Sequence, residues 1–296
     1  MELTGILISV FTAFCWTITV ISFEYAGRRV GSLPVNFIRL IIGSTLLGIT
    51  LLFTSGSFIP LGVSLNAWTL LMISGFIGLV IGDLFLFQAF VDIGGRISLL
   101  IMSTVPIMSA LLGYFFLNES LSGKSIIGII IILTAVMTAI LAKNSNKEEK
   151  HPHLRKGIIF AVIGAIAQSI GLLFSKNGMG DMGAFEATQI RLFAAIIGFT
   201  IFIFVKQDWN SVYQALNKKK AMLFISLGSV FGPFLGVSSS LLALKYIEMG
   251  VATTVAQLNV IMIIPFSIFL FKEKVNLIEI LASLIALKPP ATSMML

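Results

Sequence analysis

Three ionisable side chains lie within long apolar stretches of this sequence: Arg39, Asp83 and Arg191. A charged group at the centre of a membrane-spanning helix costs about 2.5–3.5 kcal/mol, so each of them needs a partner or a function. Arg39 lies near the start of its stretch and Asp83 near the end of its own, which places both near the same face of the membrane. We therefore predict that they lie close together and partly neutralise each other. The alternative is that Arg39 extends its charged end to the membrane interface.

Arg191 occupies the place in the second half of the chain that Arg39 occupies in the first half. The counterpart of Asp83, however, is Val237, so Arg191 is predicted to lack the matching carboxylate. An arginine without such a partner, facing a cavity, can bind a carboxylate or phosphate through its planar group of N–H donors. Backbone carbonyls or water are the alternative partners.

Several polar but uncharged residues also stand within apolar stretches. Trp16 and Gln168 occupy equivalent positions in the two halves, which suggests a facing pair in a central cavity. Any of these side chains can instead form a hydrogen bond between helices. With the three charged residues, the predicted substrate-binding set is Trp16, Arg39, Asp83, Gln88, Gln168, Arg191, Gln257 and Asn259.

The composition shows what kind of elements must position these residues. Of 296 residues, 57% are hydrophobic and only 11% are charged, whereas a soluble domain carries about 25% charged residues. Most of the exterior must therefore face lipid. The formal net charge of +7 comes mainly from Lys and Arg between the apolar stretches, which is typical of cytoplasmic loops and not of a nucleic-acid-binding surface.

The apolar stretches have the length of membrane-spanning helices. Such a helix needs roughly twenty apolar residues. The spans predicted in this way are Leu3–Phe23, Val35–Phe53, Ala67–Ala89, Ile97–Leu117, Gly123–Ala142, Lys156–Phe174, Glu186–Val205, Ala221–Leu244 and Val251–Phe271. A tenth begins at Val275 but is cut short by Lys288-Pro289-Pro290, because consecutive prolines break a helix. Residues 143–155 form the one extended polar linker.

The chain contains an internal repeat. A shift of 152 residues places Ile38-Arg39-Leu40 on Ile190-Arg191-Leu192. A ladder of small residues, Ser74, Gly78 and Gly82, recurs as Gly228, Gly232 and Gly236. Small residues at this spacing line one helix face and allow close helix packing.

An odd number of helices in each repeat makes the second copy enter the membrane from the opposite side. We therefore predict an all-α integral membrane protein of about ten transmembrane helices in two inverted five-helix repeats. The first repeat covers residues 1–142 and the second covers residues 156–296. The excess of basic residues in the loops after odd-numbered helices predicts that these loops are cytoplasmic and that both termini lie outside.

The repeat, the contexts of Arg39 and Arg191, and the span ends Phe116-Leu117-Asn118-Glu119 and Leu270-Phe271-Lys272-Glu273 resemble the EamA-type transporters of the drug/metabolite transporter superfamily. The resemblance implies movement of amino acids, other metabolites or drugs through a central cavity formed by helices 1–4 and 6–9. The second half of the sequence departs from the family's pattern at one position, because Val260 stands where the repeat would place a second copy of Pro106.

The expected function is therefore secondary transport of a small metabolite, with an amino acid as one candidate and export as the expected direction. A proton-coupled multidrug exporter and a non-transporting membrane scaffold or receptor are the alternatives. The predicted first helix, Leu3–Phe23, contains no acidic residue, which argues against the cation–proton exchange of small multidrug resistance relatives. Burial of Asp83 favours its protonated form and pairing with Arg39 favours its charged form, so proton coupling stays open.

An enzyme is not expected, because the sequence contains neither a His-Glu-x-x-His nor a Gly-x-Ser-x-Gly motif and no segment long enough for a soluble catalytic domain. No catalytic residue, metal ligand or cofactor is predicted. The expected partners are the lipid bilayer and a small solute, and not nucleic acid. The expected location is a cell membrane, either a plasma membrane or an inner membrane.

Overall fold

The computed structural model describes residues 2–117 and 153–271, and all regular secondary structure in these two ranges is helical. Eight helical segments there are long and apolar enough to cross a membrane. They correspond to the first four predicted spans and to the sixth through the ninth. The fifth predicted span, Gly123–Ala142, and the tenth, from Val275, lie outside the described residues, as does most of the polar linker.

The first half contains two continuous spans followed by two interrupted ones. The first two are α1 (Glu2–Val30) and α2 (Ser32–Ser55). The third is built from α3 (Leu65–Ser74), the π-helical segment η1 (Gly75–Gly82) and α4 (Asp83–Ile93). The fourth consists of α5 (Gly95–Met102) and α6 (Val105–Leu117).

The second half follows the same plan. Its continuous spans are α8 (Leu154–Met179) and α9 (Ala184–Lys206), and they are followed by the short helix α10 (Trp209–Leu216). The next span contains α11 (Lys219–Ser229), the π-helical segment η2 (Val230–Gly236) and α12 (Val237–Ala243). The last described span contains α13 (Met249–Ala256), α14 (Asn259–Met262) and α15 (Ile264–Phe271).

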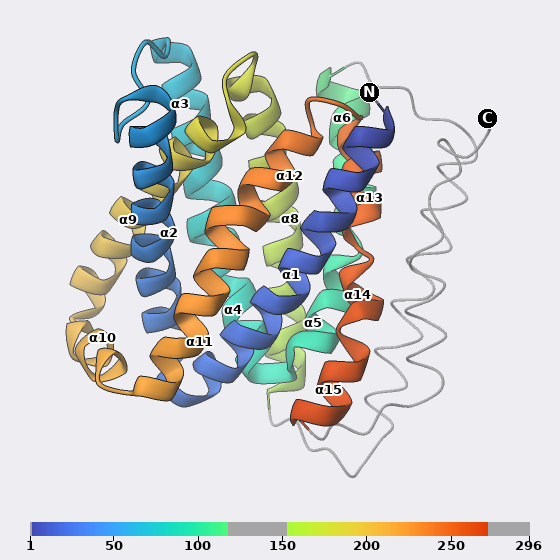
Figure 1. The fold of residues 1–296 in the computed structure, drawn as a ribbon. Coiled ribbons are helices and arrows are strands. Elements are labelled where there is room, and N and C mark those ends of the chain that lie inside the picture. Colours follow the sequence, from blue (N-terminus) through green and yellow to red (C-terminus); the bar gives the residue numbers. More distant parts are fainter. Residues whose placement is uncertain (1, 118–152, 272–296) are drawn as a thin grey trace.

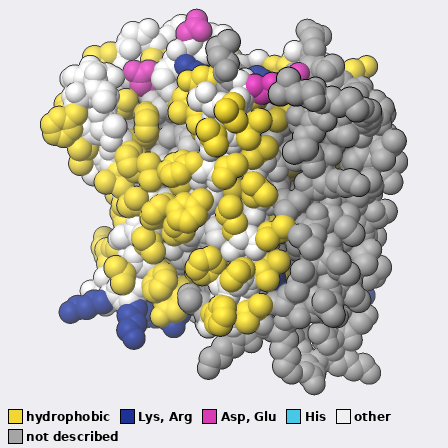
Figure 2. Space-filling model, turned by 45° about the vertical axis from the view of Figure 1, so that its right-hand side comes forward, with side chains coloured by type: hydrophobic (Ala, Val, Ile, Leu, Met, Phe, Trp, Pro, Cys, Tyr) yellow, Lys and Arg dark blue, Asp and Glu magenta, His cyan; other side chains and the backbone are white. Residues whose placement is uncertain are grey.

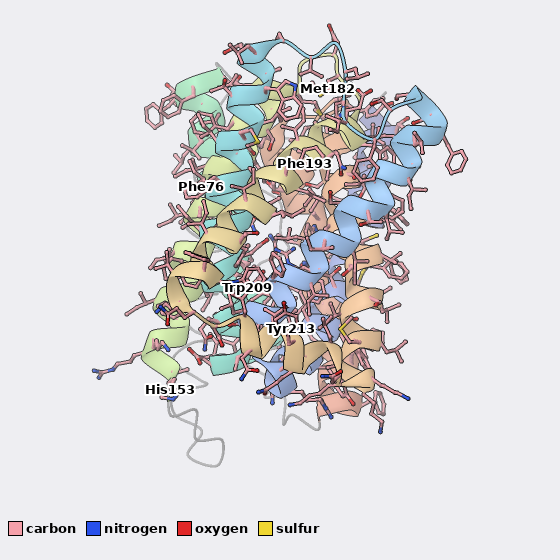
Figure 3. The ribbon with its side chains drawn as sticks, turned by 90° about the vertical axis from the view of Figure 1, so that its left-hand side faces the viewer. Phe76, His153, Met182, Phe193, Trp209 and Tyr213 are labelled. Atoms are coloured by element: carbon pink, nitrogen blue, oxygen red, sulfur yellow. The ribbon has the colours of Figure 1, made fainter. Side chains whose placement is uncertain are left out.

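The two halves run through the bundle in opposite directions. In Figure 1, α1 descends from the N-terminus at the top to the lower end. In Figure 3, His153 before α8 lies at the lower end and Met182 after α8 lies at the upper end. The first helices of the two halves are therefore antiparallel, as the inverted repeat predicts. The division of the chain at residue 142 remains a prediction.

The small-residue ladders join the two halves. Gly78 lies against Gly171 of α8 so closely that a Cβ added to Gly171 would be 2.9 Å from the Cα of Gly78. The Ser74 hydroxyl, one turn away, donates to the Gly171 carbonyl at 2.6 Å. The second ladder packs in the same way on α1, where Gly232 lies against Thr19. Each ladder thus brings the third span of one half against the first helix of the other.

The outside of the bundle matches the lipid-facing exterior predicted from composition. Figure 2 shows hydrophobic side chains over the middle of the visible face and basic side chains at its lower edge. We call the lower end the basic end; it is defined by exposed residues at the end of α1 and the starts of α8 and α11, namely Arg28, Arg29, Arg155, Lys156, Lys218, Lys219 and Lys220. The helix α10 also lies at this end (Figure 3), where the ring of Trp209 is 5.5 Å from that of Phe37.

Candidate functional site

A cavity lies between the two halves of the bundle. Its empty space measures about 1060 Å³, counting the part that is open to solvent. Side chains of α1, α2, η1, α4, α5, α6, α8, α9, α12, α13 and the start of α14 line it. All of the predicted binding residues except Gln88 are among them, so the structure brings together residues that lie far apart in the sequence. Their role in binding remains a prediction.

Arg39 and Asp83 form a buried ion pair in the wall of this cavity. The Arg39 Nε donates to the Asn36 side-chain oxygen at 3.1 Å. Its guanidinium carbon lies 4.6 Å from the centre of the Phe87 ring, where a cation is attracted to the negative face of the ring. Only 2% of Arg39 is exposed, so it does not extend to the interface. The predicted pairing of Arg39 with Asp83 is confirmed.

Asp83 also connects the two halves. Gln168 of α8 donates from its Nε2 to the Asp83 Oδ1 at 2.6 Å, while Arg39 of α2 binds the other carboxylate oxygen. Asn36 adds a hydrogen bond of 3.3 Å to the Asp83 backbone carbonyl. Both side-chain oxygens of Asp83 therefore have partners. Trp16 of α1 lines the same cavity as Gln168.

Arg191 has different surroundings. It is 2% exposed, and its Nε has no hydrogen-bond partner among the residues that the structure describes. Asp83 is the carboxylate that attracts it electrostatically, but Asp83 is engaged by Arg39 and Gln168. Val237, the counterpart of Asp83, also lines the cavity. Arg191 therefore lacks, in the second half, the carboxylate that Arg39 has in the first.

The backbone of η1 positions Arg191. Gly75 lies so close to α9 that an added Cβ would overlap the carbonyl oxygen of Arg191 and lie 2.8 Å from its Cα. A Cβ on Gly78, one turn later, would lie 3.4 Å from the guanidinium of Arg191. These two glycines leave the space that the arginine occupies.

The fourth span of each half is interrupted, and the two interruptions meet at the cavity. The first falls between α5 and α6, where Pro106 occupies the first turn of α6 and, lacking an N–H, cannot continue the ladder of the preceding helix. The second falls between α13 and α14 at Gln257. Gln257 donates from its Nε2 to the Met102 carbonyl at 3.2 Å, which joins the two interruptions.

Two amide oxygens beside this junction have no hydrogen-bond partner among the described residues: Gln257 Oε1 and Asn259 Oδ1. Both residues are at least nine-tenths buried and line the cavity. Because the Gln257 Nε2 already donates to Met102, its oxygen is left as an acceptor. The site therefore combines a cationic donor, two acceptors and a largely apolar wall.

Gln88 lies elsewhere. Its Oε1 accepts a hydrogen bond from Ser32 at 2.8 Å, and its Nε2 donates to Asp92 at 2.8 Å. Asp92 in turn lies 3.8 Å from the Lys156 ammonium at the basic end. Gln88 thus connects helices, which is the alternative use of an amide within a span.

Glu24 is a buried acidic residue that the sequence analysis did not single out. The prediction ended the first helix at Phe23 and was wrong there, because α1 continues to Val30. Glu24 is 1% exposed, forms an ion pair with Arg28 at 2.6 Å, and accepts a hydrogen bond from the Gly95 backbone at 2.9 Å. It is not among the residues that line the cavity. The spacing of Glu24 and Arg28, one helical turn apart, could have indicated a longer helix.

Arg96 is the second buried charge that was missed. The predicted fourth span begins at Ile97 and excludes Arg96, but α5 begins at Gly95 and Arg96 is 4% exposed. Within residues 2–117 and 153–271, no group of three or more His, Cys, Asp or Glu side chains is arranged to hold a metal ion.

Apolar helices in two antiparallel halves, with an amphipathic cavity between them, define a multi-pass membrane protein of the transporter class. The EamA-like transporter family matches residues 3–141 and 155–287, and the chain belongs to this family. The protein is therefore a membrane transporter.

Two relatives carry the same general description. An uncharacterized transporter of Archaeoglobus fulgidus is 23% identical over 302 aligned positions, covering 96% of this chain and 98% of the relative. The uncharacterized transporter YetK of Bacillus subtilis is 25% identical over 166 positions, covering 56% of this chain and only 48% of YetK. A solved structure titled "Crystal structure of protein" superposes with a TM-score of 0.67 at 14% identity, covering 97% of this chain and 95% of the other, which shows the shared fold.

Proposed function

We propose that this protein is a secondary carrier that moves a small organic metabolite across a plasma or inner membrane by alternating access, in the direction of export. The observation that carries this proposal is the cavity whose walls come from both antiparallel halves. In a carrier built from inverted repeats, the two halves exchange conformations, so that one central site opens to each side in turn.

Aromatic side chains pack together toward the basic end of the cavity. Phe87 and Phe90 line the cavity there, and their rings lie 5.4 Å apart. The ring of Phe23, in α1, lies 5.1 Å from that of Phe87, in α4, so these two rings join α1 to α4. Next to Phe23, Glu24 binds the backbone of Gly95 at the start of α5. Passage through this end requires α1 to separate from the corner between α4 and α5.

At the opposite end, the central cavity and a surface depression share one lining residue. Leu244 lines the central cavity and also a surface depression that contains Lys176, Lys245 and Glu248. Leu244 thus lies between the site and that surface depression. In the proposed carrier, movement of Leu244 would connect the site with the surface opposite the basic end.

Transport is tested with the purified full chain in proteoliposomes loaded with a panel of labelled organic acids, amino acids and amines. We expect time-dependent flux of at least one solute, saturation with concentration, and acceleration by the same unlabelled solute on the opposite side. Liposomes without protein are the control. The absence of flux for the whole panel under every imposed gradient would contradict the carrier function.

A further inference from the structure

We propose that the transported solute is a small organic monoanion whose carboxylate binds Arg191. This inference rests on the proposed function and names the class of solute for the same site. It is carried by one observation: among the described residues that line the site there are two buried guanidinium groups and one carboxylate, and that carboxylate is already engaged.

The charge count sets the sign of the solute. Among the described residues that line the cavity, those with acidic or basic side chains are Arg39, Asp83 and Arg191. Arg39 and Asp83 neutralise each other, and the second oxygen of Asp83 accepts from Gln168. The charge of Arg191 is left over. An uncompensated charge in a low-dielectric site is costly, so a ligand with one negative charge is favoured there over a neutral or cationic one.

The first half of the protein shows the geometry that the second half lacks. Arg39 is held by a carboxylate from the neighbouring span, whereas the equivalent of that carboxylate beside Arg191 is Val237. The Nε of Arg191 has no hydrogen-bond partner among the described residues. A solute carboxylate can take the place of the missing aspartate and accept two parallel N–H bonds from the planar guanidinium.

The rest of the lining describes the body of the solute. Leu79, Leu172 and Val237 form an apolar wall that suits a hydrocarbon or aromatic group. The free oxygens of Gln257 and Asn259 accept hydrogen bonds, so they suit a hydroxyl or amide N–H on the solute. An α-amino acid could also donate to these oxygens, but its ammonium cancels its carboxylate and leaves the Arg191 charge uncompensated. The geometry therefore favours a hydroxy acid over the amino acid of the same shape.

A matched series of ligands separates these possibilities. Phenyllactate, phenylalanine and 3-phenylpropionate share one skeleton and differ at the α-carbon, while phenylalaninamide is a cation without a carboxylate. Binding to the purified full chain in nanodiscs is measured by calorimetry at about pH 6, where the carboxylates are ionised and the α-amine of phenylalaninamide is protonated. We expect the two monoanions, phenyllactate and 3-phenylpropionate, to bind. Phenylalanine should bind at least about tenfold more weakly, and phenylalaninamide should show no saturable binding.

Variants at Arg191 assign the effect to this residue. Arg191→Gln should weaken binding of both acids by about tenfold or more, since charge-assisted bonds are lost. Arg191→Lys, which keeps the charge without the paired donors, should fall between Arg191→Gln and the wild type. A thermal unfolding midpoint close to wild type shows that Arg191→Gln is folded. Arg155→Gln makes the same change at an exposed arginine at the start of α8, outside the cavity, and serves as a control with wild-type affinity.

Three results would overturn the proposal: phenylalanine or its amide binding as tightly as the acids, wild-type affinity for the acids in folded Arg191→Gln, or no binding of either acid. Failure of the transport function has a different signature. If the acids bind through Arg191 but no solute crosses the proteoliposome membrane, the anion site stands and the carrier function does not. If amines or zwitterions cross and acids neither bind nor cross, the carrier function stands and the anion site does not.

Discussion

At the scale of single residues, the best-defined interaction is the buried pair of Arg39 and Asp83. Arg39 has three further supports, in Asn36, Phe23 and Phe87, and Asp83 has Gln168. Removing one member of a buried pair leaves the other charge without compensation, which costs more than removing both. The pair therefore stabilises α2 against α4 only as long as both members are present.

We predict that Asp83→Leu lowers the free energy of unfolding by about 3 kcal/mol, because Arg39 stays buried without its carboxylate. Asp83→Asn should cost less, since an amide oxygen can still accept from Arg39. The double variant Arg39→Leu with Asp83→Leu should recover part of the loss. Thermal and denaturant unfolding of the purified variants in detergent measures all three, and equal stability of Asp83→Leu and the wild type would contradict the described pairing.

Some residues of the site could be predicted from the sequence and others could not. Arg39, Asp83 and Arg191 could be predicted because charge in an apolar span is costly and therefore rare. Gln88 could not be separated from Gln168 in this way, because the same amide can bind a solute or join two helices. Glu24 was missed because hydropathy marks where apolar residues end, and α1 continues past that point with Glu24 and Arg28 paired on one face.

At the scale of elements, the spans themselves followed from the apolar stretches, but their internal shape did not. Hydropathy reports how long a segment is and does not report which carbonyl each N–H binds. The π-helical segments η1 and η2 and the interruption at Gln257 are therefore invisible to it. Pro106 did mark the interruption before α6. Val260 in the corresponding place shows that the second interruption forms without a proline.

The close packing of η1 on α9 gives a test at this scale. Gly75→Ala should destabilise the protein by about 1–3 kcal/mol and reduce flux, because the added Cβ meets the backbone of Arg191 and α9 must move. Gly82→Ala is a matched control from the same segment, since the nearest atoms to its Cβ are 3.5 Å away, an ordinary contact distance. Unfolding midpoints and initial flux rates of the two variants are compared. Equal values would contradict the prediction that the close contact between Gly75 and α9 determines stability and flux.

At the scale of the whole molecule, the inverted halves are joined through α1 and α12. The hydroxyl oxygens of Thr12 and Ser239 lie 2.9 Å apart across this contact. A disulfide needs Cβ atoms about 3.5–4.5 Å apart, and hydroxyls at hydrogen-bonding distance place them close to that range. The pair can therefore be replaced by two cysteines that lock the halves together, in a background where Cys15 is changed to Ala.

We predict that Thr12→Cys with Ser239→Cys loses flux at least about tenfold on oxidation and regains it on reduction, because alternating access requires the halves to move apart. Each single cysteine variant should keep the same flux in both conditions. Flux by proteoliposomes is measured with and without dithiothreitol, and cross-linking is followed by the shift of the band in a non-reducing gel. Undiminished flux in the fully cross-linked protein would mean that α1 and α12 move as one body.

The π-helical segment η1 has a consequence for Asp83, which follows it directly in the chain. A π-helical turn contains more residues than an α-helical turn, so η1 holds more residues than an α-helix with the same number of turns. If η1 became an ordinary α-helix, the residues of α4 would shift by one position along the helix and turn by roughly 100° about its axis. Asp83 would then point away from Arg39. The segment η2 stands before Val237 in the same way, so rewinding η1 would move the charge of Asp83 within the site, whereas rewinding η2 would turn only uncharged side chains of α12.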